Sequence, residues 1–292
     1  MNSPLKIVVL AKQVPDTRNV GKDAMKADGT VNRAALPAIF NPEDLHALEQ
    51  ALRIKDSKPD TTIHLLTMGP ARAADIIREG LFRGADGGVL LTDRKFAGAD
   101  TLATSYALSR AINRIAPDII IAGRQAIDGD TAQVGPQVAE KLGWPQVTYV
   151  EEILEYSEGC LTMRRRLEHG VEKVKCSTPL VITVNASAPH CRPRNAKFLM
   201  KYKHAKTAGE RQTQDDKPYA AELQSRKYLD IPEWGTAQID GDEKQFGLAG
   251  SPTKVKKIEN IVFQAKEARR LSSSDADIND LMKELIVNHT IG

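Results

Sequence analysis

The chain has 292 residues, with 41 Lys and Arg against 38 Asp and Glu, and a formal net charge of +3. Its length allows one large domain or two ordinary ones with a sizeable core, and its small excess of positive charge argues against nucleic-acid binding. Its 3 cysteines lie far apart and suggest no disulfide framework, zinc site or iron–sulfur site.

No segment is predicted to cross a membrane or to direct secretion. The apolar run at residues 7–11 is too short for a signal peptide. No apolar run approaches the roughly 18 residues that a membrane span requires. The sequence therefore predicts a cytoplasmic protein that does not insert into membranes.

From residue 5 to residue 150, apolar β-branched runs alternate with helical patterns. Continuous apolar runs of this kind are typical of a parallel sheet that is covered on both faces. We therefore predict an α/β fold with a Rossmann-like, open and mostly parallel sheet of the adenine-nucleotide-binding type. The predicted strands are residues 6–11, 62–67, 88–92, 118–122 and 180–184.

Helix starts are marked between these strands. Asn41 offers an N-cap, and Pro42 and two acids follow it in the first turn. Gly69-Pro70 and Asp100-Thr101 mark two more starts. In residues 100–116, apolar side chains recur every three to four positions, so one helix face is expected to be buried.

The pattern changes after residue 150. Residues 150–178 predict an antiparallel hairpin that is added to the sheet, with a turn at His169-Gly170 and outward charges at Arg164–Arg166. Residues 207–243 are polar and lack periodicity, which indicates either an extended arm on a partner or disorder. A short helix is expected from Asp275 or Asp277 to Val287. We predict an α/β domain over residues 1–205 and a C-terminal arm over residues 206–292.

The most informative segment is residues 123–136, which follow a predicted strand and lead into a helical pattern. Nucleotides bind at this position in open α/β sheets. Asp130 and Gln133 have capping-box spacing, but Pro136 would then lie inside the helix at a cost of roughly 3 kcal/mol. We therefore predict that the helix begins near Gly135-Pro136, which leaves the amides of residues 131–134 free to hold a phosphate.

Other polar or turn-forming segments also fall where the predicted strands end or the next helices begin, and such convergence is expected of a ligand crevice. They are Ala11-Lys12, residues 41–44 and residues 67–70. Each also has a structural interpretation, since Asn41 can cap a helix, Met68 can fill the core and Gly69 can form a turn. Asp128 and Asp130 can form turns or bind ribose hydroxyls, but a phosphate would have to be held by backbone amides.

Motifs that are absent narrow the function further. The chain has neither a G-x-G-x-x-G after the first strand nor a G-x-x-x-x-G-K-[ST] motif. It has no nucleophile elbow, and its 6 histidines lie in no metal-ligand spacing. The sequence therefore predicts no catalytic side chain and no metal site, and His46 is expected to pack.

Taken together, several segments are specific enough to indicate a family. They are residues 8–16, 41–49, 68–70, 84–86, 124–136 and 179–183. On these motifs the chain resembles the β (small) subunit of electron-transfer flavoproteins over essentially its full length. Residues 189–200 correspond to the partner-recognition loop of that family, although Phe198-Leu199 stand where an anchoring leucine is common.

Three further segments resemble the electron-bifurcating branch of the family: residues 96–105, 128–133 and 247–253. The resemblance implies that the crevice holds FAD and that NADH reduces it. One electron would then pass to the FAD of the α subunit and to an acyl-CoA or other flavin dehydrogenase, and the other to ferredoxin or flavodoxin. The chain would be part of an oxidoreductase complex in which the cofactor carries the redox chemistry.

The resemblance also implies a set of cofactor-binding residues. Thr131 and the amides of residues 132–134 would bind phosphate, while Thr101 and Thr104, one helical turn apart, would hold flavin or nicotinamide nucleotide. The arm over residues 206–292 would pack on the α subunit. The remaining implied residues are Ala11, Asn41, Asp44, Met68, Gly69, Gly123, Arg124, Asp128, Gly129, Asp130, Ala132, Gln133 and Val134.

Two alternative functions stay open. A housekeeping β subunit would hold a structural AMP where the ADP half of FAD would bind. A separate adenine-nucleotide sensor or adenylating enzyme could share the topology, but a Ser-Gly-Gly-type pyrophosphate loop is missing and the long arm would be unexplained.

Overall fold

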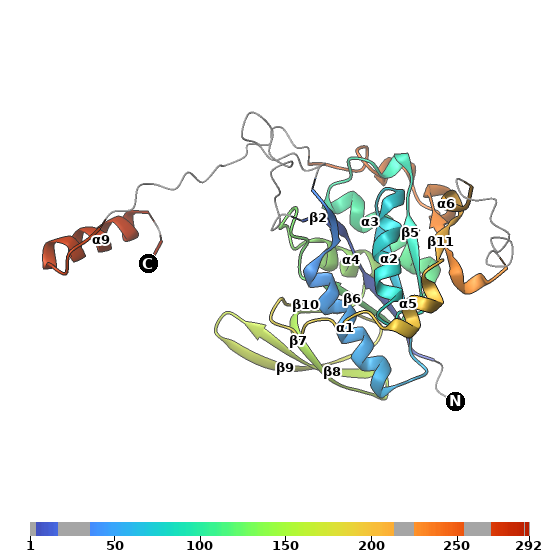
Figure 1. Cartoon of the computed structure of the whole chain (residues 1–292), viewed down its shortest axis with the longest axis horizontal. Helices are drawn as coiled ribbons and strands as arrows, with labels where there is room; N and C mark the ends of the chain where they lie inside the picture. Colours follow the sequence, from blue (N-terminus) through green and yellow to red (C-terminus); the bar gives the residue numbers. More distant parts are fainter. Residues whose placement is uncertain (1–3, 17–35, 213–224, 254–269, 289, 292) are drawn as a thin grey trace.

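The described part of the chain contains a nine-stranded sheet with helices on both faces (Figure 1). The structure, a computed structural model, describes residues 4–16, 36–212, 225–253, 270–288 and 290–291. The strand order is β13-β5-β4-β1-β6-β10-β7-β8-β9. The strands are β1 (Lys6–Leu10), β4 (Thr62–Met68), β5 (Gly87–Leu91), β6 (Ile119–Gly123), β7 (Gln146–Ser157), β8 (Cys160–Leu167), β9 (Gly170–Ser177), β10 (Leu180–Val184) and β13 (Glu233–Trp234).

The sheet is parallel from β13 to β7 and antiparallel from β7 to β9. All five predicted strands are present, and their ends differ from the predicted ones by no more than one residue. The predicted α/β class is therefore confirmed. Two short pairs lie outside this sheet: β2 (Gln13–Pro15) with β3 (Ala38–Phe40), and β11 (Lys206–Thr207) with β12 (Asp230–Ile231).

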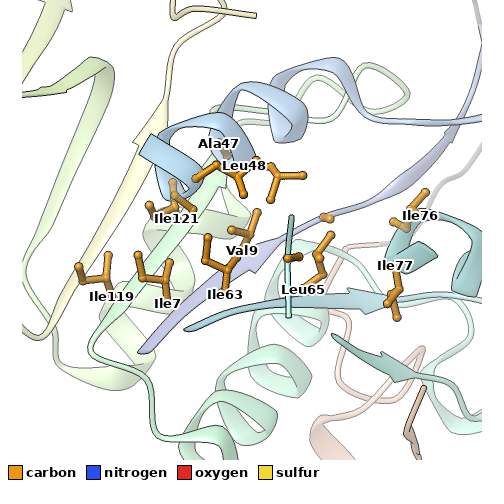
Figure 2. Packing of buried hydrophobic residues seen from close by; sticks show 14 of the residues in the cluster. Ile7, Val9, Ala47, Leu48, Ile63, Leu65, Ile76, Ile77, Ile119 and Ile121 are labelled. Carbon is orange, nitrogen blue, oxygen red and sulfur yellow. The ribbon is translucent and has the colours of Figure 1, made fainter. Parts of the chain in front are cut away.

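Helices α1 (Pro42–Ser57) and α2 (Ala74–Leu81) cover one face of the sheet, while α3 (Thr101–Ile115) and α4 (Val134–Leu142) cover the other. Because side chains alternate along a strand, β1 contributes to both cores. Ile7 and Val9 pack with α1 and α2 (Figure 2), whereas Val8 and Leu10 pack with α3 and α4. Each fully buried aliphatic side chain contributes about 1.5–3 kcal/mol to folding.

Strand β1 lies between β4 and β6. The chain leaves β1 through α1 toward β4 and β5, and then crosses through α3 to β6 on the other side. The direction of winding therefore reverses between β1 and β6. In open α/β sheets a crevice forms at the carboxyl ends of the strands that flank such a reversal.

The predicted hairpin is formed by β8 and β9, which pair antiparallel around the expected turn. The arginines of β8 make ion pairs: Arg164 and Arg166 with Glu151, and Arg165 with Glu172. Strand β7, which the sequence did not predict, joins this hairpin to β10.

Much of the segment after residue 205 contacts the α/β domain. Leu229, Ile231, Ile239 and Phe246 are buried, and β13 extends the sheet beside β5. Residues 213–224 and 254–269 of the predicted arm lie outside the described residues. The expected C-terminal helix is present as α9 (Asp275–Val287), which stands away from the domain in Figure 1.

The other helices are short. None of the helices in the described ranges is long and apolar enough to cross a membrane. The short helices are η3 (Ala71–Ala73), η4 (Arg94–Phe96), α5 (Ala196–Tyr202), α6 (Ala208–Gln212), η5 (Lys227–Leu229), α8 (Thr236–Ile239) and η6 (Glu243–Gln245).

Candidate nucleotide site

Asn41 lies at the first turn of α1, where the sequence predicts an N-cap. Asn41 is the N-cap residue of α1, as the sequence predicts, but its side chain makes no capping hydrogen bond. The side chain instead binds the loop after β6. Its Nδ2 donates to the carbonyl of Gln125 at 2.9 Å, and its Oδ1 accepts from the amide of Ile127 at 3.2 Å.

The two acids that follow bind the same region. Glu43 accepts a hydrogen bond from the amide of Gln125 at 3.0 Å, and its other oxygen lies 3.1 Å from the Arg124 guanidinium. Asp44 accepts from the amides of Lys12 at 2.8 Å and Gly123 at 3.2 Å. Both carboxylates also lie at the positive end of the helix dipole, which favours them.

Asp44 is almost completely buried. Burial raises the pKa of its carboxyl from 3.8 to about 7, although hydrogen bonds from Asn41 and from the amides of Lys12 and Gly123 act in the opposite direction. The carboxyl therefore titrates close to neutral pH while it bridges the ends of β1 and β6.

Gly123, the last residue of β6, lies directly against α1. A Cβ atom at this position would be 2.4 Å from Oδ1 of Asp44 and 2.7 Å from the carbonyl carbon of Glu43. No side chain has room there, so glycine is required for this close approach.

The next part of the loop turns sharply before α4. Asp130 and Ala132 have left-handed φ angles of 49° and 51°, whereas Gln133 has a right-handed φ of −106°. Alternation of handedness directs successive amides toward one side and forms a concave site for anions. Thr131 and Gln133 are exposed in this turn.

Helix α4 begins at Val134, one residue before the predicted start, and Gln133 makes no side-chain cap. The carboxylate of Asp130 accepts from the side chain of Gln125 at 2.9 Å. The absence of a capping box at this helix start follows the sequence prediction. It leaves the first amides of the helix without a capping side chain.

Cations offset the acids that border this crevice. Lys12, just after β1, lies 2.8 Å from Asp128 in the loop, and Arg124 pairs with Glu43. Their pairing reduces the repulsion that a phosphate would otherwise meet.

Ala11, Met68 and Gly69 lie at the ends of the neighbouring strands β1 and β4. The amide of Ala11 donates to Leu66 at 3.0 Å, and that of Gly69 donates to Leu91 at 3.0 Å. Met68 is partly buried against the core under α3 and α4. These predicted residues therefore lie at the carboxyl ends of the strands, where the loop after β6 also lies.

Thr101 connects α3 to the loop. Its hydroxyl donates to Oε1 of Gln133 at 2.9 Å, and Asp100 caps the same helix by accepting from the amide of Ala103 at 3.0 Å. Thr104 lies one turn further on and is half-buried. Its amide donates to the carbonyl of Asp100.

Residues 247–253 are hydrogen-bonded to the N-terminus of α3. Asp100 accepts from the hydroxyl of Thr253 at 2.7 Å and from its amide at 3.1 Å. Its own amide donates to the hydroxyl of Ser251 at 2.9 Å. Two of the three segments that resemble the bifurcating branch therefore lie together, and Thr101 links them to the third.

Several buried polar atoms around the crevice have no hydrogen-bond partner among the described residues: Oγ1 of Thr67, Nε of Arg124 and Oε1 of Gln137. Buried polar groups in proteins are nearly always satisfied. These atoms leave hydrogen-bonding capacity for a polar ligand. No cluster of three or more potential metal ligands occurs within the described ranges.

The predicted recognition loop is held on α1 and α2. Arg192 binds Glu49 at 3.0 Å and Asp56 at 2.7 Å, and the amide of Asn195 donates to Phe82 at 2.8 Å. Met200 is 61% exposed on α5, so the loop presents an apolar side chain among exposed lysines. His46 is buried, as expected, and binds the carbonyl of Pro189.

Sequence reasoning missed three polar residues at this site. Lys12 and Glu43 were present in recognised motifs but were assigned no individual role. Tyr149 has a left-handed φ of 58° within β7 and is 40% exposed. After Glu43, its side chain also helps to raise the pKa of the Arg124 guanidinium. No local pattern marks a tyrosine whose neighbour is 25 positions away.

Comparisons with known proteins point to one family. A model of the electron transfer flavoprotein domain matches residues 28–211. The chain is 42% identical over 261 residues to the electron transfer flavoprotein subunit beta of Megasphaera elsdenii, with 87% of each chain covered. It is 50% identical over 182 residues to the acryloyl-CoA reductase electron transfer subunit gamma of Anaerotignum propionicum, which covers 61% of this chain and 67% of the relative. It is also 36% identical over 292 residues to Protein FixA of Sinorhizobium fredii, with 97% and 93% covered.

Proposed function

The chain belongs to the electron transfer flavoprotein family as a β-type subunit, and from this premise we propose that its crevice binds FAD within an electron-bifurcating complex. Bound FAD would supply the hydride and single-electron chemistry that connects NADH to the FAD of an α subunit and to ferredoxin or flavodoxin. The reverse reaction, confurcation, uses the same components.

One observation carries this proposal. The loop at residues 123–134 lies where the sheet reverses its winding, and its turn at residues 130–133 has the backbone alternation that suits an anion. The acids beside it are paired with Lys12 and Arg124. These features suit the pyrophosphate of an adenine nucleotide.

The residues of the chain would bind and orient the cofactor. The amides of residues 131–134 would hold phosphate oxygens, and the unpartnered Nε of Arg124 could donate to the ligand. Thr101 and Thr104 would lie toward the flavin or the nicotinamide nucleotide. No side chain is required to transfer a proton.

The fixed position of residues 247–253 favours FAD over AMP. A structural AMP would need only the phosphate loop and the neighbouring strand ends. The network of Asp100, Ser251 and Thr253 instead extends the site along the start of α3. This longer wall supports a larger ligand.

The names of relatives suggest the partners. Relatives include the acryloyl-CoA reductase electron transfer subunit gamma and a subunit of the caffeyl-CoA reductase-Etf complex. We infer that this chain pairs with an α subunit and serves an acyl-CoA or other flavin dehydrogenase through residues 189–200.

The substitution Thr131→Arg tests the site. An arginine side chain at the centre of the phosphate turn should displace the ligand, while the exposed position of Thr131 should let the chain fold. The complex would be purified with its partner chain, and its FAD and AMP contents measured beside Thr131→Ser. Full occupancy in correctly folded Thr131→Arg would contradict the assignment.

A further inference from the structure

We propose that Asn41, Glu43 and Asp44 form a loop clamp, a set of positioning residues that shape residues 123–127 for nucleotide binding. Glu43 is the new member, because neither a motif nor the family resemblance gives it an individual role. The inference rests on the proposed function, since it deepens the account of how that crevice binds its cofactor.

The three clamp side chains accept hydrogen bonds from the loop backbone in a regular order. Amides of alternate loop residues donate in turn to the three clamp side chains: Gly123 to Asp44, Gln125 to Glu43 and Ile127 to Asn41. Asn41 also donates back to the carbonyl of Gln125. One turn of α1 therefore fixes the backbone of the loop at every second residue.

Burial separates this positioning role from direct ligand contact. Asn41 is 0% exposed, Glu43 6% and Asp44 7%. Buried carboxylates require partners, and here these are two loop amides, the amide of Lys12 and the Arg124 guanidinium. A ligand above the loop would meet the backbone that these side chains hold in place.

Charge supports the same assignment. A carboxylate that touched a phosphate would repel it, so Glu43 is unsuited to direct phosphate binding. Glu43 orders the amide of Gln125 and the side chain of Arg124 simultaneously. Glu43 therefore contributes to affinity indirectly, because it positions the amide of Gln125 and the side chain of Arg124, which are hydrogen-bond donors.

The test compares Glu43→Ala and Glu43→Gln in the full chain purified with its partner subunit and stripped of nucleotide. Hydrogen exchange of residues 123–127 reports loop order, and calorimetry with ADP reports affinity. Glu43→Ala should exchange faster in the loop and bind ADP about tenfold or more weakly, because a hydrogen bond to a charged group is lost. Glu140→Gln is the matched control, since Glu140 is exposed on α4.

Glu43→Gln should restore part of the protection and affinity, because its amide oxygen can still accept from Gln125 while the ion pair with Arg124 is lost. This variant carries the test if Glu43→Ala does not fold. Unchanged loop exchange and ADP affinity in a folded Glu43 variant would overturn the clamp. Failure of the unaltered complex to bind ADP, FAD or AMP would instead overturn the proposed function on which the inference rests.

Discussion

The ammonium nitrogen of Lys12 lies 2.8 Å from a carboxylate oxygen of Asp128, so that one ion pair joins the end of β1 to the loop after β6. The lysine side chain is 48% exposed and that of the aspartate 23%. An ion pair so open to solvent contributes roughly 0–1 kcal/mol to folding, and its exchange for a phosphate contact costs little. We therefore expect Lys12 to act as a counter-ion for the proposed ligand.

Replacing Lys12 should affect binding far more than folding. Lys12→Gln is expected to weaken ADP binding and to reduce its salt dependence, because one cation near the phosphate is removed. Calorimetry at two ionic strengths measures both effects. Lys173→Gln, on the exposed face of β9, serves as the control and should behave as the unaltered protein. An unchanged salt dependence in Lys12→Gln would rule out the counter-ion role.

Alanine should destabilise the protein at one glycine of this loop and have little effect at another. Gly123→Ala would press a methyl group against Asp44 and Glu43 and should destabilise the protein by about 1–3 kcal/mol, the usual cost of overpacking. Gly129→Ala should be nearly neutral, because no atom lies within 4 Å of the position that its Cβ would take. Urea unfolding of both variants makes the comparison. Equal stabilities would show that α1 and β6 are not in such close contact.

Asp44 should make stability depend on pH. Its pKa is about 7 in the folded protein against an ordinary value of 3.8, so only the folded state holds the proton between these values. The free energy of unfolding must then fall as pH rises through this interval. Asp44→Asn cannot titrate, so its stability relative to the unaltered protein should improve from pH 5 to pH 8. Urea unfolding measures both free energies of unfolding. If their difference stays constant from pH 5 to pH 8, the raised pKa of Asp44 is refuted.

Asp100 should control the segment 247–253. Asp100→Ala removes the helix cap, at a cost of about 0.5–2 kcal/mol, and both bonds to Thr253. Hydrogen exchange should therefore become faster in residues 247–253 while the hairpin β8–β9 stays protected. Asp60→Ala, in the exposed turn before β4, is the control. Equal exchange in the two variants would mean that another contact holds the segment.

The sequence was sufficient to predict the central sheet because its strands are continuous apolar runs. Strand β10, for example, is buried at all five positions and matches its prediction. The start of α3 was predictable for a local reason, since Asp100 caps an amide three residues away. Strand β7 was missed because most of its residues after Val150 are acidic or polar and its pairing partners lie elsewhere in the chain.

The sequence was sufficient to predict where the candidate site lies, but not which side chains make contact within it. The position of the loop followed from the strand before it and from Pro136, whose lack of an N–H argued against a helix start at Asp130. The contacts of Glu43 and Asn41 span 82 to 86 positions, and no local pattern encodes them. The same limit applied to residues 225–253, whose buried side chains are too sparse to form a periodic pattern.

The central claim is that the crevice of this β-type subunit holds FAD. The complex of this chain with its α subunit should be purified without added cofactor and denatured, and the released flavin and adenine nucleotides should be counted by chromatography. Two FAD molecules per heterodimer, and no AMP, is the predicted result. One FAD together with one AMP would contradict the claim and assign the chain to the housekeeping type.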